Sequence, residues 1–199
     1  MVLAEAGLLV HTRSHTAAAA PDLQINFNAA VPALVPPSYP GDPRLTYNFV
    51  AILGQPQSQG AVTLRSADPD TPPVIRHNYL ECETDVEVMV YSIKLARRMM
   101  RTRAMTPFNA GEIAPGEQIQ SDEALRDFVR NNVFTIWHPV GTCKMGRDRL
   151  AVVDPQLRVR GVRGLRVADA SIMPTIPSSN PNAACFMIGE KVADLVRTT

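Results

Sequence analysis

The chain has 199 residues, 45% of them apolar, and a formal net charge of +1 at neutral pH. This length can bury one ordinary hydrophobic core, or one and a half small ones. Lysine and arginine are spread along the chain, so the charge pattern argues against nucleic-acid binding and against a polybasic membrane-binding segment. The longest apolar runs are far too short to span a membrane, and we expect no transmembrane segment.

The cysteines argue against a zinc-binding or disulfide-rich protein. Cys82, Cys143 and Cys185 are few, odd in number and widely spaced, without a C-x-x-C pair. This usage favours buried or half-buried thiols in a reducing compartment, and we expect a cytoplasmic protein without a zinc or disulfide framework. His11 and His15 lie four residues apart but have no acidic partner nearby, so we expect no metal site. The N-terminal "MVLAEAGLLVHTR" lacks the basic region of a secretory signal.

Alternating polar and apolar residues predict strands in the first 80 residues. "DLQINFNAA" and "LTYNFVAIL" have this pattern, and "GAVTLRSADPD" is followed by a partner strand in "PPVIRHNYL". Proline-rich connections such as "VPALVPPSYPGDP" separate them. We therefore expect a mainly antiparallel sheet.

Helices follow the sheet. Apolar residues at helical spacing predict one helix from Thr84 to Thr102. Ser121 is a good N-cap for a second helix that ends near Asn132. After it, "VFTIW" is β-prone and predicts a strand with His138 at its end. "AVVDPQLRVRGVRGLRVADASIMP" has the pattern of three short strands, and "NAACFMIGEKVADLV" predicts a final helix. The fold class is α+β.

His138 is a candidate general base. Pro139 restricts the residue before it to extended conformations, and Gly141 and Gly146 let the next loop approach a neighbour closely. Histidine is the side chain best suited to taking up and returning a proton near neutral pH. The alternative is a histidine that only caps a turn.

The start of the final helix is the second candidate. Asn180 is expected to be its N-cap, with Pro181 at the first helical position. Free N–H groups and the positive end of the helix dipole favour an anion or a developing negative charge there. Asp169, at the end of a predicted strand and followed by the small Ala170, could border a ligand. The alternative is a plain capping asparagine.

A family resemblance is carried by the same residues. "WHPVGTCKMG", "VVDPQLRVRGVRGLRVADASIMP" and "SSNPNAACFMIGEKVADL" resemble, in this order, the C-terminal signature of the glucose–methanol–choline (GMC) oxidoreductases. The choline-dehydrogenase-like branch is the most similar. The first 130 residues resemble the substrate-binding part of that family more loosely. We therefore divide the chain into a substrate-binding part, residues 1–136, and a part with the catalytic motifs, residues 137–199.

The resemblance implies a reaction and residue roles. In the family an alcohol is oxidised to an aldehyde or ketone by hydride transfer to N5 of FAD. His138 would be the base and Asn180 its catalytic partner. The implied FAD-contacting residues are Trp137, Asp169, Ala170, Pro181, Asn182 and Ala183.

The resemblance also implies a missing part. The family begins with a G-x-G-x-x-G turn that binds the FAD pyrophosphate, and this sequence contains none. We therefore expect the C-terminal portion of such an enzyme, with an N-terminal FAD-binding half as its partner, a small alcohol as substrate and weak FAD binding by the chain alone. Two alternatives are a non-catalytic fragment or assembly module and a lyase that splits cyanohydrins.

Overall fold

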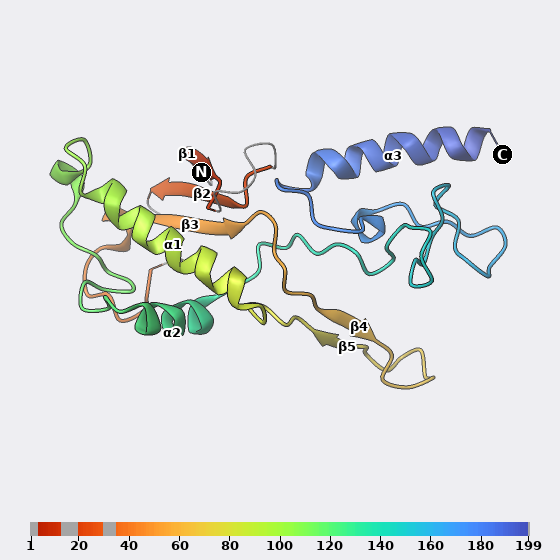
Figure 1. Cartoon of the computed structure of the whole chain (residues 1–199), viewed down its shortest axis with the longest axis horizontal. Coiled ribbons are helices and arrows are strands. Elements are labelled where there is room, and N and C mark those ends of the chain that lie inside the picture. Colours follow the sequence, from red (N-terminus) through yellow and green to blue (C-terminus); the bar gives the residue numbers. More distant parts are fainter. Residues whose placement is uncertain (1–3, 13–19, 30–34, 199) are drawn as a thin grey trace. The chain divides into compact units, whose positions relative to one another are not determined.

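The computed structural model describes residues 4–12, 20–29 and 35–198 and divides into two compact units (Figure 1). The first unit consists of Met1–Ser58 and Tyr79–Val133, and the second of Gln59–Asn78 and Phe134–Thr199. The first unit holds the larger sheet and two helices, and the second holds the predicted site residues. The architecture is mixed α and β with small antiparallel sheets, as predicted.

The larger sheet has the strand order β1-β2-β3, formed by Ala6–Val10, Leu23–Ala29 and Tyr47–Leu53. All pairing is antiparallel, and Ile25 lies opposite Leu8 on one side and Ala51 on the other. Leu23 and Ile25 are buried against Val88 of the first helix. β2 and β3 confirm the predicted strands. β1 was not predicted, because its sequence AGLLV is apolar throughout and does not alternate.

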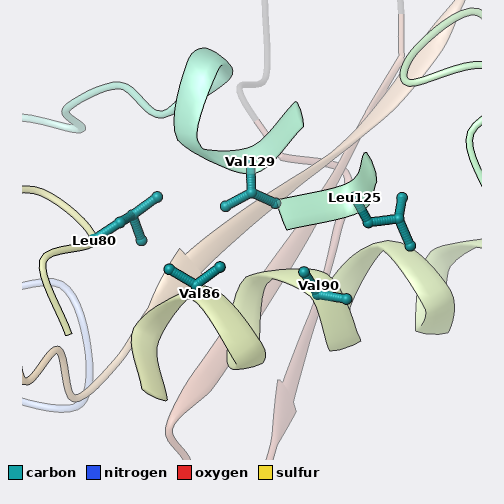
Figure 2. Packing of buried hydrophobic residues seen from close by; sticks show 5 residues of the cluster. All are labelled: Leu80, Val86, Val90, Leu125 and Val129. Carbon is teal, nitrogen blue, oxygen red and sulfur yellow. The ribbon is translucent and has the colours of Figure 1, made fainter. Parts of the chain in front are cut away.

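Helices α1 (Glu83–Met100) and α2 (Asp122–Asn132) confirm the two predicted helices and pack against each other. Ser121 caps α2, since its Oγ accepts a hydrogen bond from the N–H of Ala124 at 3.2 Å. Figure 2 shows the apolar side chains between the helices. The buried members of this cluster are Leu80, Val86, Val90, Leu125 and Val129. Burial of each contributes about 1.5–3 kcal/mol relative to an exposed side chain.

Two charged side chains fix connecting segments to α1. Asp85, in its first turn, is 1% exposed. Its carboxylate accepts hydrogen bonds from the N–H groups of Gln57, at 2.9 and 3.1 Å, and Ser58, at 2.8 Å. Near the other end, Arg97 donates two hydrogen bonds to Glu112, at 2.8 and 2.9 Å. The same guanidinium also donates to two backbone carbonyls of that loop, at 3.2 and 2.8 Å, so it holds the loop against the helix.

The second unit contains a two-stranded ribbon and little other sheet. Strands β4 (Ala61–Thr63) and β5 (Val74–Arg76) pair antiparallel, as predicted. The three further strands predicted after residue 150 are wrong. Only isolated bridges join this region, between Met145 and Val153, Val153 and Val159, and Arg158 and Arg166.

Tight turns explain why the strands predicted after residue 150 do not form. Asp154 accepts hydrogen bonds from the N–H groups of Gln156 and Arg158, at 2.9 and 3.0 Å, which curls the chain immediately. Gly161 and Gly164 have φ of 78° and 73°, in the left-handed region that favours glycine. No extended segment between these turns is long enough for a ladder. The hydrogen bond from the Arg158 backbone N–H is the main reason that the pKa of Asp154 lies below its ordinary range; the Arg158 side chain and the Gln156 N–H also lower this pKa.

The remaining elements are 3-10 turns and the last helix. The turns are Pro43–Leu45 (η2), Thr106–Phe108 (η3) and Ala170–Ile172 (η4), and α3 spans Asn182–Arg197. α3 packs on the second apolar cluster through Ile188, with Ala184, Cys185, Val192 and Leu195 around it. The other buried members are Val153, Leu157, Ile172 and Met173. None of the helices in the described ranges is long and apolar enough to cross a membrane.

Candidate functional site

The backbone turns sharply just before His138. Trp137 has φ of 59°, a left-handed conformation that is unusual for a bulky residue. Thr135 holds this turn, because its Oγ1 accepts a hydrogen bond from the Trp137 N–H at 2.9 Å. Trp137 is 79% exposed and His138 is half-buried. The predicted strand "VFTIW" is wrong: the segment has no partner strand in the described residues, and the turn ends any extended run.

The His138 side chain is available for a ligand. Within the described part of the chain, its imidazole ring forms no hydrogen bond or ion pair. A ring without an internal partner can accept a proton from a bound hydroxyl group. Pro139 follows it and restricts its backbone.

The loop after His138 is fixed against the segment before α3. Gly141 has φ of 87°, and a Cβ atom there would lie 3.4 Å from the carbonyl oxygen of Met173. Two backbone hydrogen bonds join the segments, from Cys143 to Ser171 at 3.0 Å and from Met145 to Ile172 at 2.7 Å. The left-handed φ favours a glycine at position 141, while the distance to Met173 alone would still admit a Cβ atom.

The start of α3 differs from the prediction by one residue. Asn180 is exposed and is not the N-cap; that position is taken by Pro181, which is buried and already has helical φ and ψ of −74° and −4°. Proline cannot supply a side-chain acceptor, so the first turn has no side-chain cap. Among the described residues, the N–H groups of exposed Asn182 and Ala183 have no hydrogen-bond partner, so they can bind an electron-rich ligand.

Asp169 has a structural role in the turn that follows it. It caps the 3-10 turn Ala170–Ile172, since one carboxylate oxygen accepts a hydrogen bond from the Ser171 N–H at 2.7 Å. In the described residues its other oxygen has no hydrogen-bond partner. Asp169 is exposed and Ala170 half-buried.

One apolar cluster connects these segments. It includes Val140 after His138, Ala170 after Asp169, and Ala184 in the first turn of α3. The structure thus holds the predicted segments on a common support. It forms no hydrogen bond between His138 and Asn180, in the residues that are described.

Sequence reasoning missed two residues that shape the site. Thr135 is a hydroxyl residue two positions before the turn at Trp137, a spacing typical of side-chain turns. Met173 meets Gly141 only because the chain folds back over 30 residues, and no local signal shows this contact. A hollow of about 390 Å³ lies in the hairpin between Asp154 and Arg166, and none of the predicted site residues lines it.

Comparison with known proteins identifies the family. Residues 56–189 match the family model for the C-terminal region of the GMC oxidoreductases. The chain belongs to the GMC oxidoreductase family. An oxygen-dependent choline dehydrogenase from Escherichia coli strain UTI89 is 48% identical over 140 residues, which are 70% of this chain and 25% of that protein. The predicted similarity to the choline-dehydrogenase-like branch is confirmed.

Solved GMC structures share the fold. Pyridoxine 4-oxidase from Mesorbium loti matches 97% of this chain and 38% of its own chain, with a TM-score of 0.85 and 28% identity. A formate oxidase variant from Aspergillus oryzae RIB40, in a study of FAD modification, matches 90% of this chain and 32% of its own chain, with a TM-score of 0.78 and 29% identity. The GMC family includes FAD-dependent oxidoreductases. The match covers about a quarter of the curated relatives' length, so this chain corresponds to a C-terminal fragment of such a protein.

Proposed function

We propose that this chain is the substrate-binding and catalytic-base portion of an FAD-dependent enzyme that oxidises an alcohol to an aldehyde or ketone. The support of His138, Asp169 and the start of α3 by one apolar cluster carries the proposal. Residues 1–136 would form the substrate-binding part and residues 137–199 the part that meets the cofactor. A choline-like alcohol is the substrate that the sequence similarity favours.

His138 would take the hydroxyl proton of the alcohol. Its ring is half-buried and has no partner in the described residues, so the imidazole is not already engaged when an alcohol binds. The turn at Trp137 and Pro139 limit the backbone on both sides, which fixes the direction in which the His138 side chain leaves the backbone. Asn180 would add an amide donor to the alcohol oxygen, which fits its exposed side chain.

The start of α3 fits an electron-rich flavin edge. Its first N–H groups are uncapped, the dipole adds positive potential, and the small Ala183 does not obstruct a planar ring. FAD, when bound, supplies the acceptor for the hydride. Asn182 and Ala183 would contact the ring system beside Pro181, and Trp137 would cover it. The second carboxylate oxygen of Asp169 would accept a hydrogen bond from a hydroxyl group of the cofactor. The small side chain of Ala170 would leave room for the cofactor beside it.

The pyrophosphate would need another polypeptide. The sequence contains no G-x-G-x-x-G turn, and the hollow of the second unit is not lined by the proposed site residues. We therefore propose an N-terminal FAD-binding polypeptide as the partner that completes the site, with weak FAD binding by the chain alone.

The test is His138→Ala in the assembled enzyme. Removal of a general base is expected to lower turnover by about 10²–10⁴-fold. His11→Ala is the control, because His11 is exposed and lies in the other unit. A loss below tenfold for His138→Ala would remove His138 from the role of base. Asn180→Ala should slow flavin reduction more than it lowers flavin content; the reverse pattern would make Asn180 a cofactor anchor.

A further inference from the structure

The hollow in the hairpin between Asp154 and Arg166 has a lining that the proposed reaction does not use. Its volume is about 390 Å³, within the range of sites that bind small molecules. Asp154 is the one acidic residue of this lining. The basic residues of the lining are four arginines: Arg158, Arg160, Arg163 and Arg166.

Three of these arginines are oriented by contacts within the second unit. Arg158 donates a hydrogen bond to the Asp154 carboxylate at 2.8 Å. Arg160 and Arg166 each donate to a backbone carbonyl oxygen, at 2.7 and 3.2 Å. A guanidinium group has five N–H donors, so Arg158 and Arg160 retain donors for a ligand.

The charge of Arg163 is not balanced by any of these contacts. Its side chain is exposed and, within the described residues, forms no hydrogen bond or ion pair. Asp154 neutralises one guanidinium group, that of Arg158, so the lining has an excess of three positive charges. Positive charges around one hollow repel each other, and a bound anion would remove that repulsion.

The hairpin also lies in a basic stretch of the chain. Seven of the 20 basic residues, but only two acidic ones, fall between Lys144 and Arg166. The net charge of this stretch is +5, although that of the whole chain is only +1. A local excess of this sign attracts anions from solution and raises their concentration near the hollow.

We infer that this hollow is a binding site for a phosphomonoester, whose phosphate group is held by the guanidinium groups of the lining, Arg163 among them. The planar fork of arginine matches the oxygens of a phosphate group, and a phosphomonoester has about −1.5 to −2 charges at neutral pH, more than a carboxylate. Val162 and Leu165, 51% and 49% exposed, provide apolar surface for the organic part of the ligand. The inference does not depend on the FAD-dependent reaction.

The experiment is titration of the whole chain with phenyl phosphate near neutral pH. Benzoate is the matched probe, because it has the same ring and a single negative charge. A salt concentration of about 0.15 M limits general attraction to a Debye length of about 8 Å. Backbone NMR locates the site through the amides of Gly161 and Gly164, compared with those of Asn182 and Ala183 at the start of α3.

Two variants with the same change in charge separate the site from its surroundings. Arg163→Gln removes the unbalanced guanidinium group without breaking a contact within the described residues. Arg147→Gln is the control, since Arg147 is exposed and lies in the same basic stretch but does not line the hollow. Thermal unfolding checks that both variants are folded.

Phenyl phosphate is expected to shift the hairpin amides and to bind at least about tenfold more tightly than benzoate. Arg163→Gln should weaken its binding by about tenfold, as for the loss of a hydrogen bond to a charged group, and Arg147→Gln by less than about twofold. Vesicles of phosphatidylcholine with and without phosphatidic acid distinguish the source of the phosphomonoester. Binding to phosphatidic acid that Arg163→Gln abolishes indicates a lipid head group, and binding of phenyl phosphate without it indicates a soluble ligand; either result supports the site.

Four results would overturn the inference. They are shifts at the start of α3 in place of the hairpin, equal affinity for benzoate, equal weakening by the two variants, and no binding of either phosphate probe.

Discussion

Asp85 provides a sharp test of how the first unit is held together. Its carboxylate is almost completely buried and accepts hydrogen bonds from the N–H groups of Gln57 and Ser58. Asp85→Ala leaves both donors without an acceptor. Each unsatisfied buried donor costs about 1–3 kcal/mol, and water can reach exposed Gln57, so the expected loss in the free energy of unfolding is about 2–4 kcal/mol. Asp85→Asn keeps one acceptor and should lose about half as much.

The assay combines urea denaturation with hydrogen exchange of individual amides. The Gln57 and Ser58 amides should exchange faster in Asp85→Ala than the rest of the unit, because the loop is released before the sheet opens. Asp127→Ala, on the exposed face of α2, removes a carboxylate without this network and should change stability by less than about 0.5 kcal/mol. If Asp85→Ala were no more destabilising than Asp127→Ala, with unchanged exchange at Gln57 and Ser58, the role of Asp85 would be refuted.

Three further predictions concern other contacts. Arg97→Ala should lower the free energy of unfolding by about 2–3 kcal/mol in denaturation curves, because it leaves a half-buried carboxylate unpaired, whereas its exposed neighbour Arg98→Ala should change it by less than about 0.5 kcal/mol; equal effects would contradict this. The pKa of Asp154 is lowered in the folded hairpin, so its contribution to stability is present above its unfolded-state pKa and is lost as pH falls through the lowered value. Carboxyl NMR titration should show this low pKa, and Asp154→Asn should remove the acid step; an ordinary titration would argue against the hairpin contacts. Gly141→Ala should destabilise the chain by about 1–2 kcal/mol through its positive φ, while Gly189→Ala, in open helical surroundings, should be neutral or stabilising; the opposite order in thermal unfolding would refute the local geometry.

The sequence predicted the first unit well where one face of an element is buried. Alternation in "DLQINFNAA" gave β2, and the apolar stripe of α1 gave its helix within a few residues. The spacing of apolar residues in these segments reflects which face is buried, so the element can be predicted from neighbouring residues alone. Strand β1 was not predicted because it is short, apolar and mostly exposed, and because its pairing with β2 is a long-range contact.

The strands predicted in the second unit failed for a related reason. Residues 151–169 have the β-prone composition of strands, but their turns come every few residues, and only isolated bridges form in the described chain. A segment with high strand propensity forms a β-ladder only when a partner strand lies beside it, because strand propensity largely reflects packing against neighbouring strands. The one-residue error at Asn180 has a different cause. Pro181 occupies the N-cap position with helical φ and ψ but has no side-chain acceptor. The sequence alone does not show whether the helix begins after Asn180 or after Pro181.

The candidate site residues were proposed from sequence motifs, but the contacts that hold them in place could not be predicted from the sequence. Nothing local connects Gly141 with Met173, or Thr135 with the left-handed turn at Trp137, yet these contacts set where His138 stands. Trp137 and Phe186, both in the motif region, are also among the most exposed large apolar residues of the described chain. Leu45, Leu64 and Phe108, outside the motifs, are comparably exposed, so exposure alone does not single out the two motif residues. The motif residues could therefore be named from the sequence, whereas the contacts that position His138 are long-range or depend on a strained turn and had to come from the structure.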